Sequence, residues 1–125
     1  LSRKIMKLYP LKEEHYEFVR LLRNSQPGFL TPNVNITPEQ QIKYMDKNHT
    51  HYYLCSSETN PLGFIGVMEN DIRLCTHPDA QGKGVGTFML EEIVKLYPDA
   101  TGRILKDNLS SQKAFEKAKV PYKII

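Results

Sequence analysis

The sequence has no tryptophan and only two cysteines among its 125 residues. Two cysteines cannot build a disulfide scaffold, and no Cys-x-x-Cys pair suggests a zinc module. No apolar run approaches the roughly 20 residues that a helix needs to cross a bilayer. The basic residues at the start lead into no apolar core of a signal peptide. We therefore expect a cytoplasmic protein with no membrane partner, folded as one domain over residues 1–125.

The excess of positive charge is small, at +3 from 17 basic and 14 acidic residues. Nucleic-acid binding favours a concentrated basic face, so no nucleic-acid partner is expected. The basic residues are nevertheless dense in 101–125, which holds Arg103, Lys106, Lys113, Lys117, Lys119 and Lys123 against Asp107 and Glu116. This segment either binds a small polyanion or forms an ordinary solvated helix face.

The spacing of apolar residues predicts an alternation of strands and helices. Pro27-Gly28 should break the first helix and open a loop over 26–36. Thr37 should cap the second helix, which should turn Ile42 and Met45 inward. The expected strands are 5–10, 51–55, 62–68, 72–77, 103–105 and 122–125, and the expected helices are 11–24, 37–48, 85–96 and 110–119.

The most informative segment is the glycine-rich stretch 81–87, which follows a strand and opens a helix. Glycines let the backbone approach a bound group, and the first N–H groups of a helix favour an anion such as a phosphate. The spacing fits neither a P-loop nor a dinucleotide fingerprint. A glycine-rich turn without a ligand is the plain alternative. The pattern Gln81-x-x-Gly84-x-Gly86 does resemble the acetyl-CoA pyrophosphate loop of the GNAT superfamily of N-acetyltransferases.

The resemblance to GNAT proteins extends from residue 62 to about residue 115. Residues 62–66 look like the family's third strand, 74–80 like its fourth strand and exit, and 81–94 like the loop and helix. The next helix resembles the family's Asn-x-x-Ala-x-x-x-Tyr-Glu-Lys segment at Asn108, Ser111 and Phe115. The implied fold is α/β (α+β), with a mixed, mostly antiparallel central sheet of about six strands flanked by helices on both faces.

In this family the fourth and fifth strands splay apart and hold acetyl-CoA between them. The resemblance therefore implies an N-acetyltransferase that uses acetyl-CoA as co-substrate. A primary amine, on a small molecule or a peptide, would attack the thioester directly. The implied cofactor-binding residues are Leu74, Cys75, Thr76, Gln81, Gly82, Lys83, Gly84, Val85, Gly86, Thr87, Asn108, Ser111 and Phe115.

The candidates for catalysis lie on the fourth strand. Alternation places Asp71, Arg73 and Cys75 on one face. Asp71 is the first candidate for a general base and Glu69 the second, although both could be exposed hairpin carboxylates. Cys75 would lie beside the thioester, and nucleophilic catalysis by its thiol is the less favoured alternative because no histidine is placed to activate it.

Both cysteines should be free thiols. Cys55 and Cys75 are expected on second-neighbour strands, about 10 Å apart, which is beyond the reach of a disulfide. His49 and His51 provide too few converging ligands for a metal site, so no metal is expected.

The resemblance has two departures. Phe115 stands where the family usually has a tyrosine proposed to protonate the departing thiolate. The sequence also ends after one C-terminal strand where the family has two, which suggests a homodimer through that sheet edge. Two alternatives therefore remain: a non-catalytic or regulatory CoA-binding module, and an acyltransferase that uses a different acyl-CoA.

The acceptor is not specified by the sequence. Residues 21–24 and the helix start at Thr37 are similar to a GNAT branch that acetylates amino sugars and the N-termini of ribosomal proteins. A nucleotide-linked amino sugar, a peptide amine and a small free amine all remain open.

Overall fold

The computed structural model describes residues 5–26 and 35–125. The expected helix break at Pro27-Gly28 and most of the expected loop lie outside this part. The strands are β1 (Lys7–Pro10), β2 (Tyr52–Ser56), β3 (Pro61–Met68), β4 (Asp71–Thr76), β5 (Gly102–Ile104) and β6 (Tyr122–Ile124). The α-helices are α1 (Tyr16–Ser25), α2 (Pro38–Asn48), α3 (Val85–Leu96) and α4 (Leu109–Ala118), with short 3-10 turns at Glu13–His15, His49–His51 and Pro78–Ala80. The expected order of elements is confirmed.

Strands β1 to β4 form an antiparallel sheet in chain order. Glu69 and Asn70 make the tight turn between β3 and β4, and both have positive φ angles of 52° and 65°. Two successive residues with positive φ give the turn a backbone twist that matches the twist of the flanking strands, which favours a two-residue hairpin. The turn fixes the register in which Phe64 faces Cys75 and Gly66 faces Arg73.

The expected single sheet of six strands is divided in two. Strands β5 and β6 pair in parallel as a separate two-stranded sheet. The two sheets meet at the start of β4, where Thr101 bridges Asp71 in parallel and accepts a hydrogen bond from the Ile72 N–H at 2.9 Å. From this junction β4 and β5 diverge instead of continuing their ladder. The GNAT resemblance implied this splay, whereas the strand periodicity could not show it.

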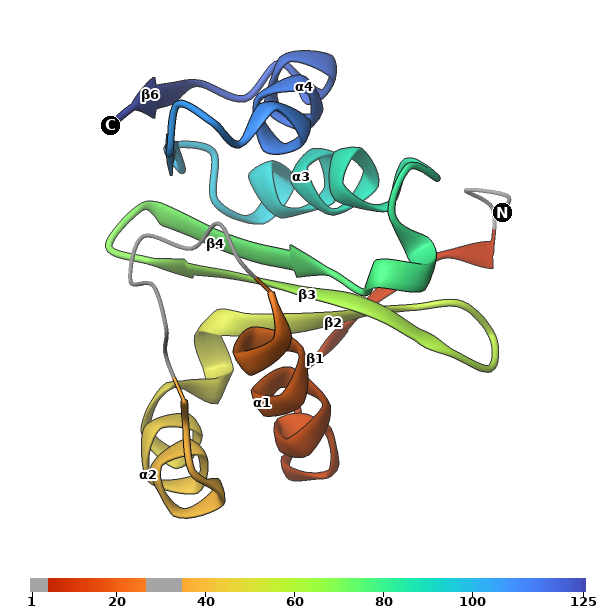
Figure 1. Cartoon of the computed structure of the whole chain (residues 1–125), viewed down its shortest axis with the longest axis vertical. Coiled ribbons are helices and arrows are strands. Elements are labelled where there is room, and N and C mark those ends of the chain that lie inside the picture. Colours follow the sequence, from red (N-terminus) through yellow and green to blue (C-terminus); the bar gives the residue numbers. More distant parts are fainter. Residues whose placement is uncertain (1–4, 27–34) are drawn as a thin grey trace.

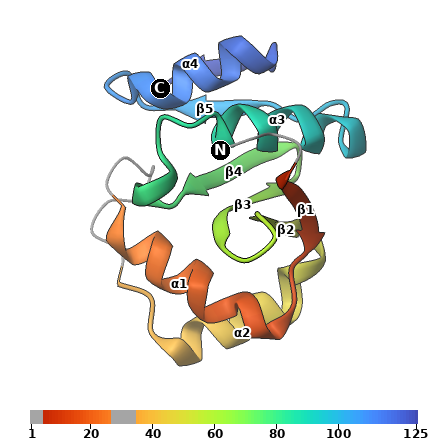
Figure 2. The same ribbon diagram turned by 90° about the vertical axis from the view of Figure 1, so that its right-hand side faces the viewer.

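Helices cover both faces of the four-stranded sheet, as expected. Figures 1 and 2 show α1 and α2 on one side and α3 on the other, with α4 beyond α3. One core cluster joins the sheet to α1 and α2 and includes Leu22, Tyr52 and Cys75. The second joins the sheet to α3, α4 and β5 and includes Met89 and Phe115. No helix in the described part of the chain is long and apolar enough to cross a membrane.

Helix α2 begins as the sequence predicts but turns a different face inward. The Thr37 hydroxyl accepts a hydrogen bond from the Gln40 N–H at 3.1 Å, and the Gln40 side chain accepts one from the Thr37 N–H. Met45 is buried as expected, but Ile42 is 47% exposed and Gln41 is buried instead. Gln41 is accommodated because its amide donates to the carbonyl of Tyr16 at 3.0 Å.

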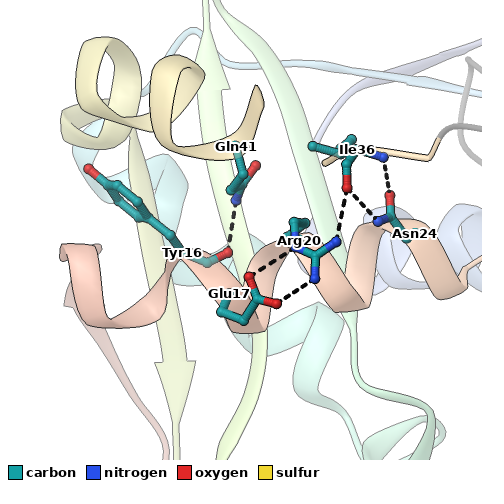
Figure 3. A network of polar contacts seen from close by, with 6 residues as sticks. All are labelled: Tyr16, Glu17, Arg20, Asn24, Ile36 and Gln41. Atoms are coloured by element: carbon teal, nitrogen blue, oxygen red, sulfur yellow. Dashed lines mark hydrogen bonds and ion pairs between the residues drawn. The ribbon is translucent and has the colours of Figure 1, made fainter. Parts of the chain in front are cut away.

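A polar network joins α1 to the chain that leads into α2 (Figure 3). Asn24 accepts a hydrogen bond from the Ile36 N–H at 2.8 Å and donates one to the Ile36 carbonyl at 3.0 Å. Arg20, which is ion-paired with Glu17, donates to the same carbonyl at 3.0 Å. This network fixes the end of α1, and so the position of the neighbouring residue Arg23.

Candidate functional site

The divergence of β4 and β5 opens a cleft of about 1080 Å³. Its walls come from β4, the glycine-rich loop, the first turn of α3, β5 and α4. The size suits a ligand larger than a typical drug, since pockets for drug-sized molecules span roughly 300–1,000 Å³. Chain segments that lie far apart in the sequence therefore form one site.

The exposed edge of β4 provides backbone groups to this cleft. The Ile72 N–H points toward β5, whereas the His77 N–H points toward β3, where it donates to the Leu62 carbonyl at 2.8 Å. Because these directions alternate along a strand, the N–H and C=O groups of Leu74 and Thr76 also point toward the opening. Those of Arg73 and Cys75 belong to the ladder with β3. Hydrogen-bonding groups at Leu74 and Thr76 are thus available to a ligand.

The glycine-rich loop requires glycine at two positions. Gly82 and Gly84 have φ angles of 78° and 82°, a conformation that side-chain-bearing residues rarely adopt. Gly84 occupies the N-cap of α3 and has no side chain to cap the helix. The first N–H groups of α3 therefore remain available, and the helix dipole favours an anion there. The side-chain nitrogen of Gln81 donates hydrogen bonds to Gln26 Oε1 at 3.2 Å and to the Thr76 carbonyl at 3.5 Å.

Helix α4 supplies the opposite wall. Asn108 caps this helix, since its side-chain oxygen accepts a hydrogen bond from the Ser111 N–H at 3.2 Å. Phe115 is 2% exposed, and its ring lies over Gly102, where an added Cβ would come within 2.4 Å of it. The ring centroid of Tyr122 lies 5.7 Å away, in an edge-on arrangement. Phe115 is therefore a packing residue at the cleft and has no proton to donate.

Positive charge dominates the lining of the cleft. Among the described residues that line it, the basic ones are Arg23, Arg73, Arg103, Lys113 and Lys117. Asp71 is the acidic one. Its carboxylate accepts two hydrogen bonds from Arg103, at 2.9 and 3.1 Å, and lies 3.7 Å from Nε of Arg73. Both carboxylate oxygens of Asp71 thus accept hydrogen bonds from Arg103, and its role as general base stays a prediction.

Cys75 lines the cleft but is a buried thiol. It is 7% exposed, and burial raises its pKa to about 12. The same cause raises the pKa of Cys55 to about 12. Both cysteines are free, as expected. The thiolate is the reactive form of cysteine, so a thiol held neutral at physiological pH is a poor nucleophile.

The structure brings together nearly all the residues that the sequence indicated for acetyl-CoA. All of them line the cleft except Lys83. The predicted site residues did not include Arg23, Gln26, Arg73, Arg103, Lys113 or Lys117, which also line the cleft, although the dense positive charge of 101–125 anticipated three of them. Residues 21–24, which include Arg23, resembled a branch of the family but did not place Arg23 in the cleft. Gln26 had no signal, because the end of α1 reaches the cleft only through the fold.

Several other candidates have structural roles. His77 caps the 3-10 turn Pro78–Ala80 by accepting a hydrogen bond from the Asp79 N–H at 3.1 Å. Glu69 is an exposed turn residue with positive φ. His49 lies against the Met45 carbonyl and the Tyr16 hydroxyl. The described residues contain no group of three or more His, Cys, Asp or Glu that could hold a metal ion.

Sequence comparison decides the family. Residues 14–119 match the acetyltransferase (GNAT) family. The chain belongs to this family. No curated protein matches the sequence. As a GNAT protein, the chain places its splayed strands and its glycine-rich loop where the resemblance implied.

Solved GNAT structures share the fold. The spermidine N-acetyltransferase of Vibrio cholerae, solved with CoA and spermine, superimposes with a TM-score of 0.77 at 12% identity, covering 92% of this chain and 80% of that one. The microcin C7 self-immunity acetyltransferase, solved with acetyl-CoA and AMP, gives a TM-score of 0.70 at 14% identity, covering 90% and 77%. At these identities the likeness shows the fold and not the acceptor.

Proposed function

We propose that this GNAT protein is an acetyl-CoA-dependent N-acetyltransferase that moves the acetyl group to a primary amine by direct attack. The observation that supports it most strongly is the cleft between β4 and β5. The free backbone edge of Leu74 and Thr76 lies in the same cleft as the glycine-rich loop that begins α3.

The pyrophosphate, the pantetheine arm and the thioester of acetyl-CoA would each meet a matching group in the cleft. The pyrophosphate fits the loop at Gly82 and Gly84, where N–H groups and the helix dipole stabilise negative charge. Lys113 and Lys117 of α4 add positive charge beside it. The pantetheine arm has amide groups that can pair with the edge of β4 as a further strand would.

The thioester carbonyl would accept a hydrogen bond from a backbone N–H at Leu74 or Thr76. Such a donor polarises the carbonyl and stabilises the oxyanion that forms on attack. The amine nitrogen bonds to the carbonyl carbon, the carbon–sulfur bond breaks, and the thiolate leaves. The proton lost by the amine ends on the CoA sulfur. Because Phe115 has no proton and Asp71 is held by arginines, water carries it. Positioning of the two substrates supplies much of the acceleration.

A non-catalytic CoA-binding module is the second candidate. Phe115 in the cleft and the pairing of Asp71 with Arg103 both favour it, because Phe115 has no acidic proton and the carboxylate oxygens of Asp71 are engaged by Arg103. Binding of acetyl-CoA without release of CoA thiol across a panel of amines would support this module over the enzyme.

Calorimetric titration with acetyl-CoA is the direct test, with Gly86→Leu as the site variant. An added Cβ at Gly86 would make ordinary contacts, 3.6 Å from Ala114 and 3.8 Å from Thr76, so the fold should tolerate the change. The rest of the leucine side chain would occupy the cleft. It should raise the dissociation constant of acetyl-CoA about 10-fold or more, which corresponds to a loss of roughly 1.4 kcal/mol of binding free energy.

The control is Lys95→Leu, which puts the same side chain at a position of α3 that does not line the cleft. It should leave the affinity for acetyl-CoA unchanged. No binding by the unmodified protein at millimolar acetyl-CoA would refute the proposal. Equal affinity of Gly86→Leu and the unmodified protein would refute the placement of the cofactor.

A further inference from the structure

The side of the cleft that faces α1 and α2 has a surplus of positive charge. Three elements contribute one arginine each: Arg23 from α1, Arg73 from β4 and Arg103 from β5. Alternation along β4 places Arg73 on the same face as Cys75, which packs against α1 and not α3. On β5, Gly102 and Ile104 are buried while Arg103 is exposed, so Arg103 points away from the core shared with α3 and α4.

Two of these arginines, Arg73 and Arg103, lie against one carboxylate. Asp71 accepts two hydrogen bonds from Arg103 and lies 3.7 Å from Arg73, whose other guanidinium nitrogen donates to the Tyr44 hydroxyl at 3.3 Å. The Asp71 side chain is 20% exposed, against 47% for Arg73 and 50% for Arg103. The carboxylate is thus mostly covered, and the guanidinium groups form the surface that a ligand meets.

The local charges do not cancel. Three guanidinium groups lie on this side of the cleft, and Asp71 is the acidic residue among the described cleft residues. Residues 1–4 and 27–34 contain no aspartate or glutamate. Burial lowers the pKa of the Arg23 guanidinium, because burial disfavours its charged form. The net positive charge of the three guanidinium groups would attract an anion bound beside them.

The cofactor does not account for this charge. The first turn of α3, which follows the glycine-rich loop, and the two lysines of α4 lie on the side of the sheet that α3 and α4 cover, and from this loop Gln81 reaches across to Gln26 at the end of α1. Gly86 approaches Ala114 of α4 on that side. The phosphates of acetyl-CoA therefore have their own cations, and the arginines face the side from which an acceptor reaches the thioester.

We propose that the acceptor amine carries an anionic group, a carboxylate or a phosphate, which the Arg23, Arg73 and Arg103 guanidinium groups bind. The inference rests on the proposed function and narrows its substrate class. Arginine binds both anions through paired N–H donors. A polyamine, the substrate named for the Vibrio cholerae relative, would bring additional positive charge to a positive surface and bind poorly.

Matched pairs of acceptors test the proposal. The rate of CoA thiol release at saturating acetyl-CoA gives kcat/KM for O-phosphoethanolamine against ethanolamine, and for 4-aminobutyrate against 4-aminobutanol, with spermidine as the cationic member. We expect the anionic member of at least one pair to exceed its neutral partner about 10-fold or more, as charge-assisted hydrogen bonds predict. The two pairs distinguish a phosphate from a carboxylate.

Arg73→Gln supplies the residue-level readout, with Lys47→Gln as its control. Arg73→Gln removes a cation from the cleft, whereas Lys47→Gln removes an exposed cation of α2 that does not line the cleft. Arg73→Gln should raise KM for the anionic acceptor about 10-fold and change KM for its neutral partner little. Acetyl-CoA affinity should stay the same in both variants, which separates acceptor binding from cofactor binding.

The outcomes distinguish the two proposals. If the protein binds no acetyl-CoA, the proposed function fails and the inference fails with it. If acetyl-CoA binds, calorimetric titration of the CoA-bound protein with each acceptor gives a second reading that needs no turnover. Tighter binding of an anionic amine than of its neutral partner, lost in Arg73→Gln, supports the inference. Equal binding within both pairs, or a preference for spermidine, overturns it and leaves the cofactor assignment intact.

Discussion

Burial of single side chains explains the chemistry of the two thiols. Cys55 is fully buried and Cys75 nearly so, and in each case desolvation raises the pKa to about 12. At about pH 8 a thiol with that pKa is ionised in roughly one molecule in ten thousand. This environment is consistent with the direct transfer that we propose, which needs no acetyl-cysteine intermediate.

We predict that the free energy of unfolding falls as the pH rises above about 8.5, the ordinary pKa of a thiol. In the unfolded chain the thiols lose their protons there, whereas in the folded protein they keep them until about pH 12. The stabilisation is therefore complete below the unfolded pKa and lost as the pH rises. Between about pH 8 and pH 10 the loss should reach at most about 2 kcal/mol per thiol.

Urea denaturation at these two pH values measures the effect. Cys55→Ala should make the pH dependence shallower, whereas Val67→Ala, another buried truncation in the same core cluster, should lower stability without changing that dependence. Identical pH dependence in Cys55→Ala and the unmodified protein would contradict the prediction.

At the scale of residues, the sequence predicted which residues line the cleft better than it predicted how their charges are paired. Gly84 and Phe115 were found because a motif names them, and both line the cleft. Asp71 was expected as a base because its strand position can be read from alternation. Its pairing with Arg103, a residue 32 positions later, depends on where β5 meets β4, which no local pattern records.

Among the elements, β4 has two different edges. One is bonded to β3 along its whole length, and the other meets β5 only near Asp71. This asymmetry supplies the backbone groups that we assign to acetyl-CoA.

Hydrogen exchange along β4 should therefore alternate from one residue to the next. We expect the amides of Leu74 and Thr76 to exchange at least about 10-fold faster than those of Arg73 and Cys75, because the latter donate to β3. Addition of acetyl-CoA should slow Leu74, Thr76 or both. Residue-resolved NMR exchange is the measurement, and protection of Leu74 equal to that of Cys75 in the free protein would exclude the assigned edge.

Helix α2 shows why periodicity predicted the element and missed its inward face. The capping box at Thr37 is a local signal, and the structure confirms it. The buried face is set by the partner helix, since Gln41 reaches the Tyr16 carbonyl of α1. Counting apolar residues favoured Ile42, because hydropathy takes no account of a hydrogen bond that makes burial of an amide favourable.

The whole molecule joins a four-stranded and a two-stranded sheet at one corner, and the cleft lies between them. A ligand in the cleft touches both, so its binding should stabilise the fold as a unit. At a concentration about 100 times the dissociation constant, the gain is about 2.7 kcal/mol.

Positive charge around the cleft should make this stabilisation sensitive to salt. We predict that the increase in melting temperature caused by acetyl-CoA shrinks between about 0.05 and about 0.5 M NaCl, because added ions screen the attraction between the lysines and the phosphates. The double variant Lys113→Gln, Lys117→Gln should show a smaller increase and a weaker dependence on salt. Lys43→Gln, Lys47→Gln, an equally spaced pair on α2, is the control. A salt-independent increase would count against the lysine assignment.

The junction at Asp71 and Thr101 also bears on how the protein folds. Strands β2, β3 and β4 follow one another through short turns, so their contacts are local and form at small entropic cost. Strand β5 reaches β4 only after the chain has passed through the whole of α3. Contacts between distant segments form late, because closing the intervening loop costs entropy first. We expect the hairpins to precede the docking of β5, so that the cleft is among the last parts of the molecule to take shape.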